Sequence, residues 1–132
     1  MRGDVIIKPD SSNIQERATN FLKEIYPLLA TSDCQFQINE KNILFDREYP
    51  LTHKDKIKIL KNLSGEDCIK VEPNTNSRYS SIAEVFVFIK NVSIYQYGEK
   101  QNVEMYIKMY VKKRDFHDLV IVISFHKEGE FE

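Results

Sequence analysis

The stretch from Glu104 to His126 reads EMYIKMYVKKRDFHDLVIVISFH, and it contains two runs in which apolar and polar residues alternate. This period of two is typical of β-strands, because successive side chains of a strand point to opposite faces. The runs therefore predict strands at Glu104–Lys112 and Leu119–His126, joined by a turn at Lys113–Asp118. A connection this short favours antiparallel pairing of the two strands.

The alternation also divides the side chains of these strands between two faces. In the first strand, four apolar residues should face a core: Met105, Ile107, Met109 and Val111. Its other residues should face solvent: Glu104, Tyr106, Lys108, Tyr110 and Lys112. In the second strand, we expect the inner set Leu119, Ile121, Ile123 and Phe125, and the outer set Val120, Val122, Ser124 and His126. Pairing then gathers four side chains on the outer side of the sheet: Tyr106, Lys108, Ser124 and His126.

Upstream of this pair, Ala83–Val92 (AEVFVFIKNV) predicts a third strand, and Tyr95–Gln101, which contains Gly98, predicts a hairpin connection. The segment Val71–Ser81 contains Pro73 and several Asn and Ser residues, which is typical of a loop. Cys34–Ile38 alternates and predicts a short strand. Asn39–Tyr49 predicts a helical turn followed by irregular structure.

Helices are expected only in the first half of the chain. Apolar residues from Ile14 to Leu29 recur at helical spacing and predict a helix at about Asn13–Ala30. Ser12 or Asn13 should cap it, with Glu16 placed to close a capping box. A second helix is expected at about His53–Leu63, capped by Thr52. Helices followed by strands favour an α+β fold, with the helices packed on one face of a small antiparallel sheet. We expect residues 1–132 to form a single domain, with residues 1–11 as a flexible leader.

The composition of the chain excludes several classes of function. The chain has 19 Lys and Arg and 20 Asp and Glu, so its net charge of −1 excludes binding of nucleic acid through bulk charge but permits a local basic site. Two cysteines, Cys34 and Cys68, are too few for a disulfide scaffold or a four-ligand zinc site, and we expect two core thiols.

The longest uncharged apolar run, Leu119–Phe125, is too short to span a membrane, and no secretory signal is visible. These features predict a cytoplasmic protein without a membrane partner. No phosphate-binding glycine loop, HExxH or GxSxG motif is present, so we expect no cofactor and no metal.

Patterning alone favours a structural explanation for the polar outer face, because Tyr and Lys are common on open sheet faces. The basic residues Lys112, Lys113 and Arg114 are likewise more often solvated than functional. They are also the residues that an RNA backbone would need.

The stretch MYIKMYVKKRDFHDLVIVISFHKE resembles the C-terminal half of motility quorum-sensing regulator (MqsR) type toxins, in which a Tyr-Ile/Leu-Lys strand precedes a strand ending in Ser-Phe-His or Ser-Phe-Lys. The upstream segments ILKNLSGEDCIKVEPNTN and AEVFVFIKNV are similar to the family's helix end, loop and next strand. The resemblance covers about residues 13–127. This sequence departs from the family at Phe86 and Val87, where members usually have Trp and some have Gln.

The resemblance implies a RelE-like fold and the toxin of a type II toxin–antitoxin system, which cleaves mRNA without a metal ion and has a cognate antitoxin as partner. It places four catalytic positions on this chain: Lys70, Tyr106, Lys108 and His126. Cleavage by attack of the 2′-hydroxyl needs a base, a cation at the phosphorane and an acid. We expect His126 to be the acid or the base, Lys70 and Lys108 to hold the phosphate, and Tyr106 to position it. Four further residues are candidates for RNA binding: Arg78, Lys112, Lys113 and Arg114.

Two alternatives remain open at this point. The first is a non-catalytic module that docks a protein on its open sheet face, because tyrosine-rich faces suit that purpose. The second is an inactive homologue of such a toxin.

Overall fold

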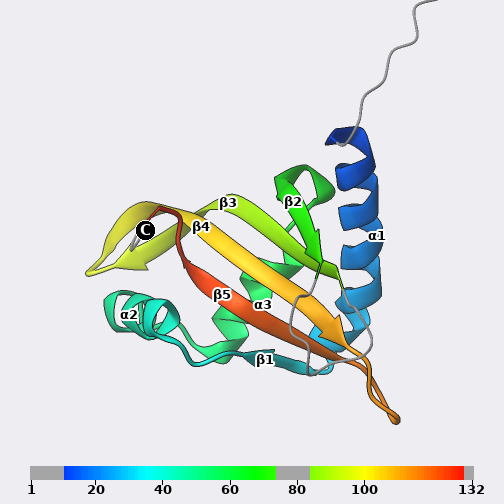
Figure 1. The fold of residues 1–132 in the computed structure, drawn as a ribbon. Helices are drawn as coiled ribbons and strands as arrows, with labels where there is room; N and C mark the ends of the chain where they lie inside the picture. Colours follow the sequence, from blue (N-terminus) through cyan, green and yellow to red (C-terminus); the bar gives the residue numbers. More distant parts are fainter. Residues whose placement is uncertain (1–10, 74–83, 130–132) are drawn as a thin grey trace, which may run out of the picture.

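The computed structural model describes residues 11–73 and 84–129. In these residues, three α-helices and a short 3-10 helix accompany a five-stranded sheet (Figure 1). The helices are α1 (Ser11–Ala30), α2 (Glu40–Glu48) and α3 (His53–Lys61), and the 3-10 helix η1 covers Gly65–Asp67. The strands are β1 (Cys34–Phe36), β2 (Cys68–Pro73), β3 (Glu84–Gln96), β4 (Glu99–Lys112) and β5 (Leu119–Lys127). The predicted α+β class is confirmed.

The sheet has the order β1-β5-β4-β3-β2. The predicted pairing of β4 with β5 is confirmed, and β3 pairs with β4 through a two-residue turn at Tyr97 and Gly98. The sheet is mixed rather than purely antiparallel, because β1 pairs parallel to β5 at its edge. β2 adds an antiparallel strand at the other edge, so the prediction of a loop is wrong for residues 71–73. The rest of that predicted loop, residues 74–81, lies outside the described residues.

The helices differ from their predicted bounds in local detail. α1 begins at Ser11, two residues earlier than expected, so its capping residue lies outside the described part of the chain, as does the predicted leader up to residue 10. α3 begins after Thr52, whose side-chain oxygen accepts a hydrogen bond from the backbone N–H of Asp55 at 3.1 Å. The Asp55 carboxylate in turn accepts one from the backbone N–H of Thr52 at 3.1 Å. α2 is a complete helix where only one turn was expected, because Asn39 caps it and Phe45 anchors it in the core.

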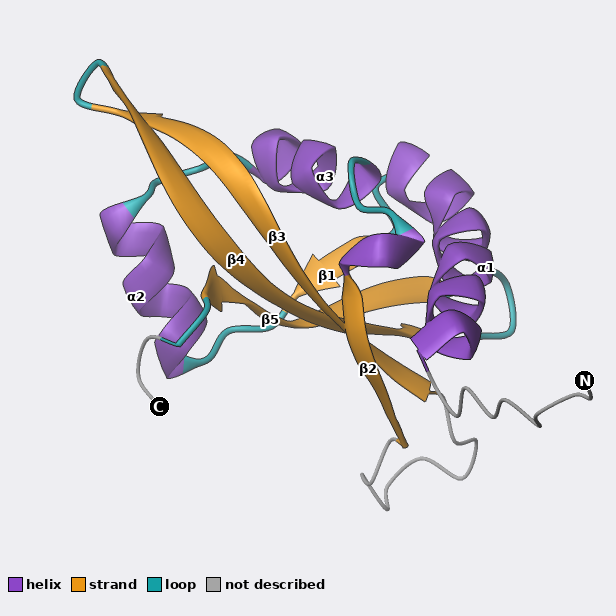
Figure 2. Cartoon of the chain, turned by 90° about the horizontal axis from the view of Figure 1, so that it is seen from above, coloured by secondary structure: helices purple, strands orange, loops and turns teal. Residues whose placement is uncertain are grey.

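The main core lies between the sheet and the helices, which all contribute to it (Figures 1 and 2). From β4 it includes the four predicted residues Met105, Ile107, Met109 and Val111, each at most 5% exposed. Phe21 of α1 stacks on Phe86 of β3 with ring centroids 4.1 Å apart. We call this helix-covered side of the sheet the inner face and the opposite side the outer face. The prediction that the helices cover one face is confirmed.

The outer face holds a second, smaller apolar cluster that the alternation did not predict. Val85, Tyr110 and Ile121 are buried there, with Leu119 and Ile123 packed against them. Tyr110 is only 8% exposed, so its predicted exposure to solvent is wrong. Leu119, Ile121 and Ile123 were assigned to the inner face, which is also wrong, whereas Val120 and Val122 belong to the main core.

The cause of this exchange of faces is a bulge in β5. Met109 pairs with Val122, but Lys108 pairs with Ser124, so Ile123 is an extra residue with no partner on β4. An extra residue shifts the alternation by one position. Phe125 therefore returns to the inner face, while Ser124 and His126 lie on the outer face as predicted.

Both cysteine thiols are buried and free, as expected for core residues. Burial raises the pKa of Cys34 to about 12 and also raises the pKa of Cys68. Among the described residues, no helix combines the length and apolar character needed to cross a membrane.

Candidate functional site

The four side chains expected on the outer face are brought together by the pairing of β4 and β5. Tyr106 lies opposite His126, and Lys108 lies opposite Ser124. The ring of Tyr106 stacks on the imidazole of His126, with centroids 5.5 Å apart and an interplanar angle of 16°. The prediction that these residues share one side of the sheet is confirmed.

His126 is less accessible than the sequence indicated. Its residue is 5% exposed, although we expected an accessible position on an open face. The stacked Tyr106 ring covers one face of the imidazole, which accounts for part of this burial. The Nδ1 atom lies 2.8 Å from the carbonyl oxygen of Lys127. Because a carbonyl can only accept, Nδ1 carries a proton in this contact, and the neutral ring keeps its lone pair on Nε2.

Lys70 reaches the same face from a different strand. In the sheet register, Lys70 of β2 pairs with Val87 of β3, and Val87 pairs with Lys108 of β4. Paired residues of neighbouring strands share a face, so both lysines lie on the outer face, on either side of the fully buried Val87. The structure therefore joins all four catalytic positions implied by the resemblance on one face.

Glu72 is the member of this group that the sequence did not reveal. Its Oε1 lies 3.1 Å from the Lys108 ammonium, and its Oε2 lies 3.5 Å from that of Lys70. The hydrogen bond from Lys108 lowers the pKa of Glu72, and the charges of both lysines add to this effect. The sequence did contain a signal for this residue, because the spacing of Lys70 and Glu72 places both side chains on one face of a strand. The signal was missed because the segment that contains Glu72 and Pro73 was predicted to be a loop.

We use the name outer-face site for the six residues Lys70, Glu72, Tyr106, Lys108, Ser124 and His126. It holds an aromatic hydroxyl, an imidazole with an accepting nitrogen, a hydroxyl and two ammonium groups around a carboxylate. Such a set can bind an anion and transfer protons. Within the described residues, no group of three or more His, Cys, Asp and Glu could hold a metal ion.

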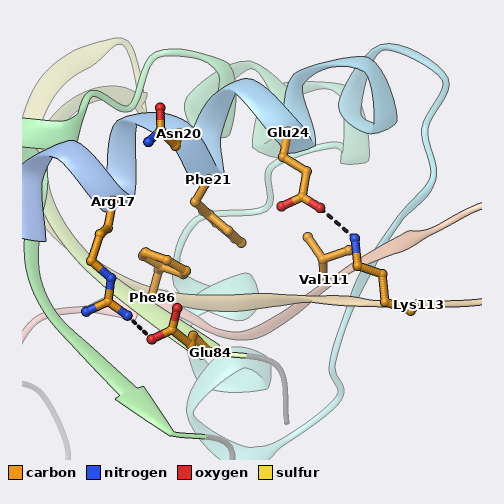
Figure 3. A pocket seen from close by; sticks show the side chains of 8 residues that line it. All are labelled: Arg17, Asn20, Phe21, Glu24, Glu84, Phe86, Val111 and Lys113. Carbon is orange, nitrogen blue, oxygen red and sulfur yellow. Dashed lines mark hydrogen bonds and ion pairs between the residues drawn. The ribbon is translucent and has the colours of Figure 1, made fainter. Parts of the chain in front are cut away.

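The candidate RNA-binding residues near the β4–β5 turn do not join this site. Lys113 lies seven residues beyond Tyr106, roughly 23 Å along an extended chain. Its ammonium contacts Glu24 of α1 at 2.6 Å and Asp118 at 3.0 Å, and these hydrogen bonds raise its pKa. Figure 3 shows Lys113 turned toward α1.

Two of the other candidates, Arg114 and Lys112, lie in or next to the β4–β5 turn. Arg114 donates to the carbonyl oxygen of His117 at 3.2 Å, which holds it within the turn. Lys112 ends β4 opposite Leu119, on the outer face beyond the apolar cluster around Tyr110. Arg78 lies outside the described residues. The structure therefore places Lys70 and Lys108 on the same face as the Tyr106–His126 pair, and it engages Lys113 and Arg114 in other contacts.

A separate pocket of about 350 Å³ lies between α1 and the ends of β3 and β4 (Figure 3). Its charged side chains form two ion pairs, Arg17 with Glu84 and Lys113 with Glu24. Because each cation there already contacts a carboxylate, this pocket has no excess charge with which to attract an anion.

Comparison of this chain with known proteins finds no matching family model, no similar curated protein and no similar solved structure.

Proposed function

We propose that the outer-face site cleaves RNA without a metal ion, and that the chain is an MqsR-type toxin with a RelE-like fold and an antitoxin as protein partner. The observation that supports this most is the stacked Tyr106–His126 pair beside two lysines on one face of the sheet. An enzyme that cleaves RNA through the 2′-hydroxyl needs a proton acceptor, a cation and a proton donor near one phosphate.

His126 is the proton acceptor in this proposal. Its Nδ1 proton is engaged by the Lys127 carbonyl, so Nε2 is the nitrogen that can take the proton of the 2′-hydroxyl. The stacked Tyr106 ring fixes the plane of the imidazole, which reduces the freedom that must be lost on reaction. The Tyr106 hydroxyl donates to a phosphate oxygen and orients it.

Lys70 and Lys108 supply the positive charge for the developing phosphorane. Both contact Glu72 in the free protein, so a bound phosphate competes with this carboxylate for the ammonium groups. The ion pairs with Glu72 hold the two lysines in place before the substrate binds, but they also reduce the affinity of the lysines for the phosphate. In this proposal, one of the two lysines also donates a proton to the departing 5′-oxygen.

The decisive experiment is single-turnover cleavage of a labelled mRNA fragment in EDTA. The parent protein should cleave, and a Tyr106→Phe variant should cleave about 10²–10³-fold more slowly because it lacks one positioned donor. His126→Gln, which keeps a polar side chain of similar size, should lose about 10²–10⁴-fold because it lacks the base. Lys70→Ala should also be impaired.

The matched control is Lys23→Ala, which removes one positive charge from an exposed position of α1 on the inner side of the sheet. It should cleave at the parent rate. Each variant is also melted, so that loss of activity is separated from loss of folding. If the folded parent leaves RNA intact in EDTA, the non-catalytic alternatives are correct. If Tyr106→Phe and His126→Gln both cleave at the parent rate, the site is elsewhere.

A further inference from the structure

The side chains of α1 divide into three stripes at helical spacing. The first, which includes Phe21 and Ile25, packs into the main core, and the second, with Arg17 and Glu24, lines the pocket of Figure 3. The third stripe lines a separate groove of about 540 Å³. It consists of Thr19, Leu22, Lys23, Tyr26 and Pro27. Spacings of three and four residues are those of a helix side that packs against another helix.

The opposite wall of this groove comes from the end of α3 and from η1 (Figure 2). Leu63 in this wall is 8% exposed, and Leu22 of α1 packs against the main core, so the two leucines form an apolar floor. A Cβ on Gly65 of η1 would lie 2.5 Å from the backbone oxygen of Gln15, so η1 and α1 close the groove at this end. We call it the α1–α3 groove.

Tyr26 lies at the edge of the α1–α3 groove and is 54% exposed. The Lys61 ammonium lies 5.8 Å from the centre of its ring, on the opposite wall. Tyrosine is enriched among the residues that dominate binding energies, because its large ring covers apolar surface while its hydroxyl can form a hydrogen bond. An exposed tyrosine over a floor of leucines is therefore suited to contact with a protein.

The charged side chains that line this groove are all positive. Lys23 and Lys61 belong to the lining, and none of the described residues in the lining is acidic. Lys54 and Lys58 are exposed and precede Lys61 at helical spacing, so the row of positive charge continues along α3. Asp55, the acidic residue of α3, is engaged in the capping box at the start of the helix. The groove therefore departs from the chain as a whole, which has a net charge of −1.

Pro27 adds a hydrogen-bond acceptor to the same groove. A proline has no backbone N–H, so the carbonyl oxygen of Lys23 lacks the donor that a helix normally supplies from four residues further on. Both residues line the groove, and this oxygen can accept a hydrogen bond there from a side chain of a bound partner.

We propose that the α1–α3 groove docks a protein partner through an amphipathic helix with acidic flanks. The stripe from Thr19 to Pro27 covers roughly 12 Å of helix axis, which matches about two turns of a docked helix. Apolar side chains of that helix cover Leu22 and Tyr26, and its carboxylates contact the lysines on both walls. The apolar floor favours a protein over an RNA strand, and the positive rim favours an acidic helix over a basic one.

This inference is independent of RNA cleavage, because α1 and α3 lie on the inner face of the sheet and the outer-face site lies on the other. A partner in the groove leaves the outer-face site uncovered. Either proposal can therefore fail without the other.

The test uses a displayed library of peptides of about 18 residues, a length at which isolated helices can form. Leucines are fixed at helical spacing, and the flanking positions vary among Glu, Gln and Lys. Selection on the parent protein should enrich Glu over Lys at these positions. The most enriched peptide is then synthesised with a fluorescent label. Tyr26→Ala should weaken its binding about 5–150-fold in anisotropy titrations.

Reversal of charge tests the rim of the groove. Lys61→Glu should weaken binding of the acidic peptide about 2–30-fold, because it replaces an attraction with a repulsion. The same peptide with its glutamates changed to lysine should bind Lys61→Glu more tightly than it binds the parent. This rescue would not occur if the variant had merely lost its fold.

Lys100→Glu is the matched control, because Lys100 is an exposed lysine beside the β3–β4 turn. It should change binding of the acidic peptide less than twofold. The inference is overturned if the selection enriches no peptide or enriches Lys at the flanks. It is also overturned if the selected peptide binds Tyr26→Ala and Lys61→Glu as it binds the parent. Displacement of the peptide by single-stranded RNA would show that the groove binds nucleic acid and would overturn the inference as well.

Discussion

Replacement of Asn42 tests whether side chains of α2 stabilise the bulge in β5. Asn42 is 6% exposed, and its amide makes three hydrogen bonds. Its Nδ2 donates to the carbonyl oxygens of Gln37, at 2.8 Å, and Ile123, at 3.0 Å. Its Oδ1 accepts from the backbone N–H of Phe125 at 2.9 Å. The last two contacts replace the strand pairing that the bulge at Ile123 gives up.

The variant Asn42→Leu keeps the approximate volume and removes all three hydrogen bonds. The Ile123 carbonyl retains a bond from Asn39 at 2.8 Å, so it is not left without a partner. The buried N–H of Phe125 loses the Asn42 acceptor, and the Gln37 carbonyl loses the Asn42 donor. Leaving a buried polar group unsatisfied costs about 1–3 kcal/mol. Since Gln37 is exposed and can bind water, we expect a total loss of about 2–4 kcal/mol in the free energy of unfolding.

Urea denaturation of the parent and two variants measures this loss. Asn62→Ala is the control, because Asn62 makes one exposed hydrogen bond, to the Lys58 carbonyl at 2.9 Å, and should cost less than about 1 kcal/mol. Asn42→Asp should be at least as destabilising as Asn42→Leu, because it buries a carboxylate and places one of its oxygens against the carbonyl oxygens of Gln37 and Ile123. If Asn42→Leu is no less stable than Asn62→Ala, α2 does not maintain the bulge.

Three further outcomes are expected. Gly65→Ala should destabilise by about 1–3 kcal/mol in thermal melts, since its Cβ would lie 2.5 Å from the Gln15 backbone oxygen; a stability equal to that of the parent would contradict this contact. Glu72→Gln should tighten binding of 2′-O-methyl RNA and steepen its salt dependence, because it removes the carboxylate that occupies both lysines of the site; unchanged binding would show that those lysines do not contact RNA. The hydrogen bonds from Thr52 lower the pKa of Asp55 below its ordinary value of 3.8, so this contribution to stability is complete above pH 3.8 and is lost as the pH falls through the lowered pKa. A Thr52→Ala variant should be less stable at neutral pH and should show a shallower decline in acid, measured by melting temperature against pH.

Features that depend on local pattern could be predicted from the sequence. Alternation identified β4 and its inner residues, and helical spacing identified α1. The Thr52 cap followed from a polar residue placed before an amphipathic run. Each of these is decided by neighbours within a few positions, so a single sequence contains the whole signal.

Features that depend on distant contacts could not be predicted in this way. β2 is a strand because β3 offers it a partner, although its own residues include Pro73 at the edge. α2 is a complete helix because Phe45 and Asn42 find their partners on β5, far along the chain. Glu72 entered the site only once β2 was placed beside β3. For the site, the sequence therefore indicated which residues share a face, and the structure showed which charged side chains they contact.

The bulge at Ile123 explains both the main error in the predicted faces and the position of the site. Without the extra residue, the alternation that buries Val120 and Val122 would also turn Ser124 and His126 inward and Phe125 outward. The bulge reverses this, so one strand contributes to the main core in its first half and presents an imidazole to Tyr106 in its second half. Asn39 and Asn42 bind the backbone where the two halves meet. An irregular strand supported by buried amides is costly to maintain for packing alone, because a regular strand would satisfy the same groups by pairing. The bulge places His126 opposite Tyr106, so under the proposed function we predict that disturbing Asn42 lowers RNA cleavage even in conditions where the protein remains folded.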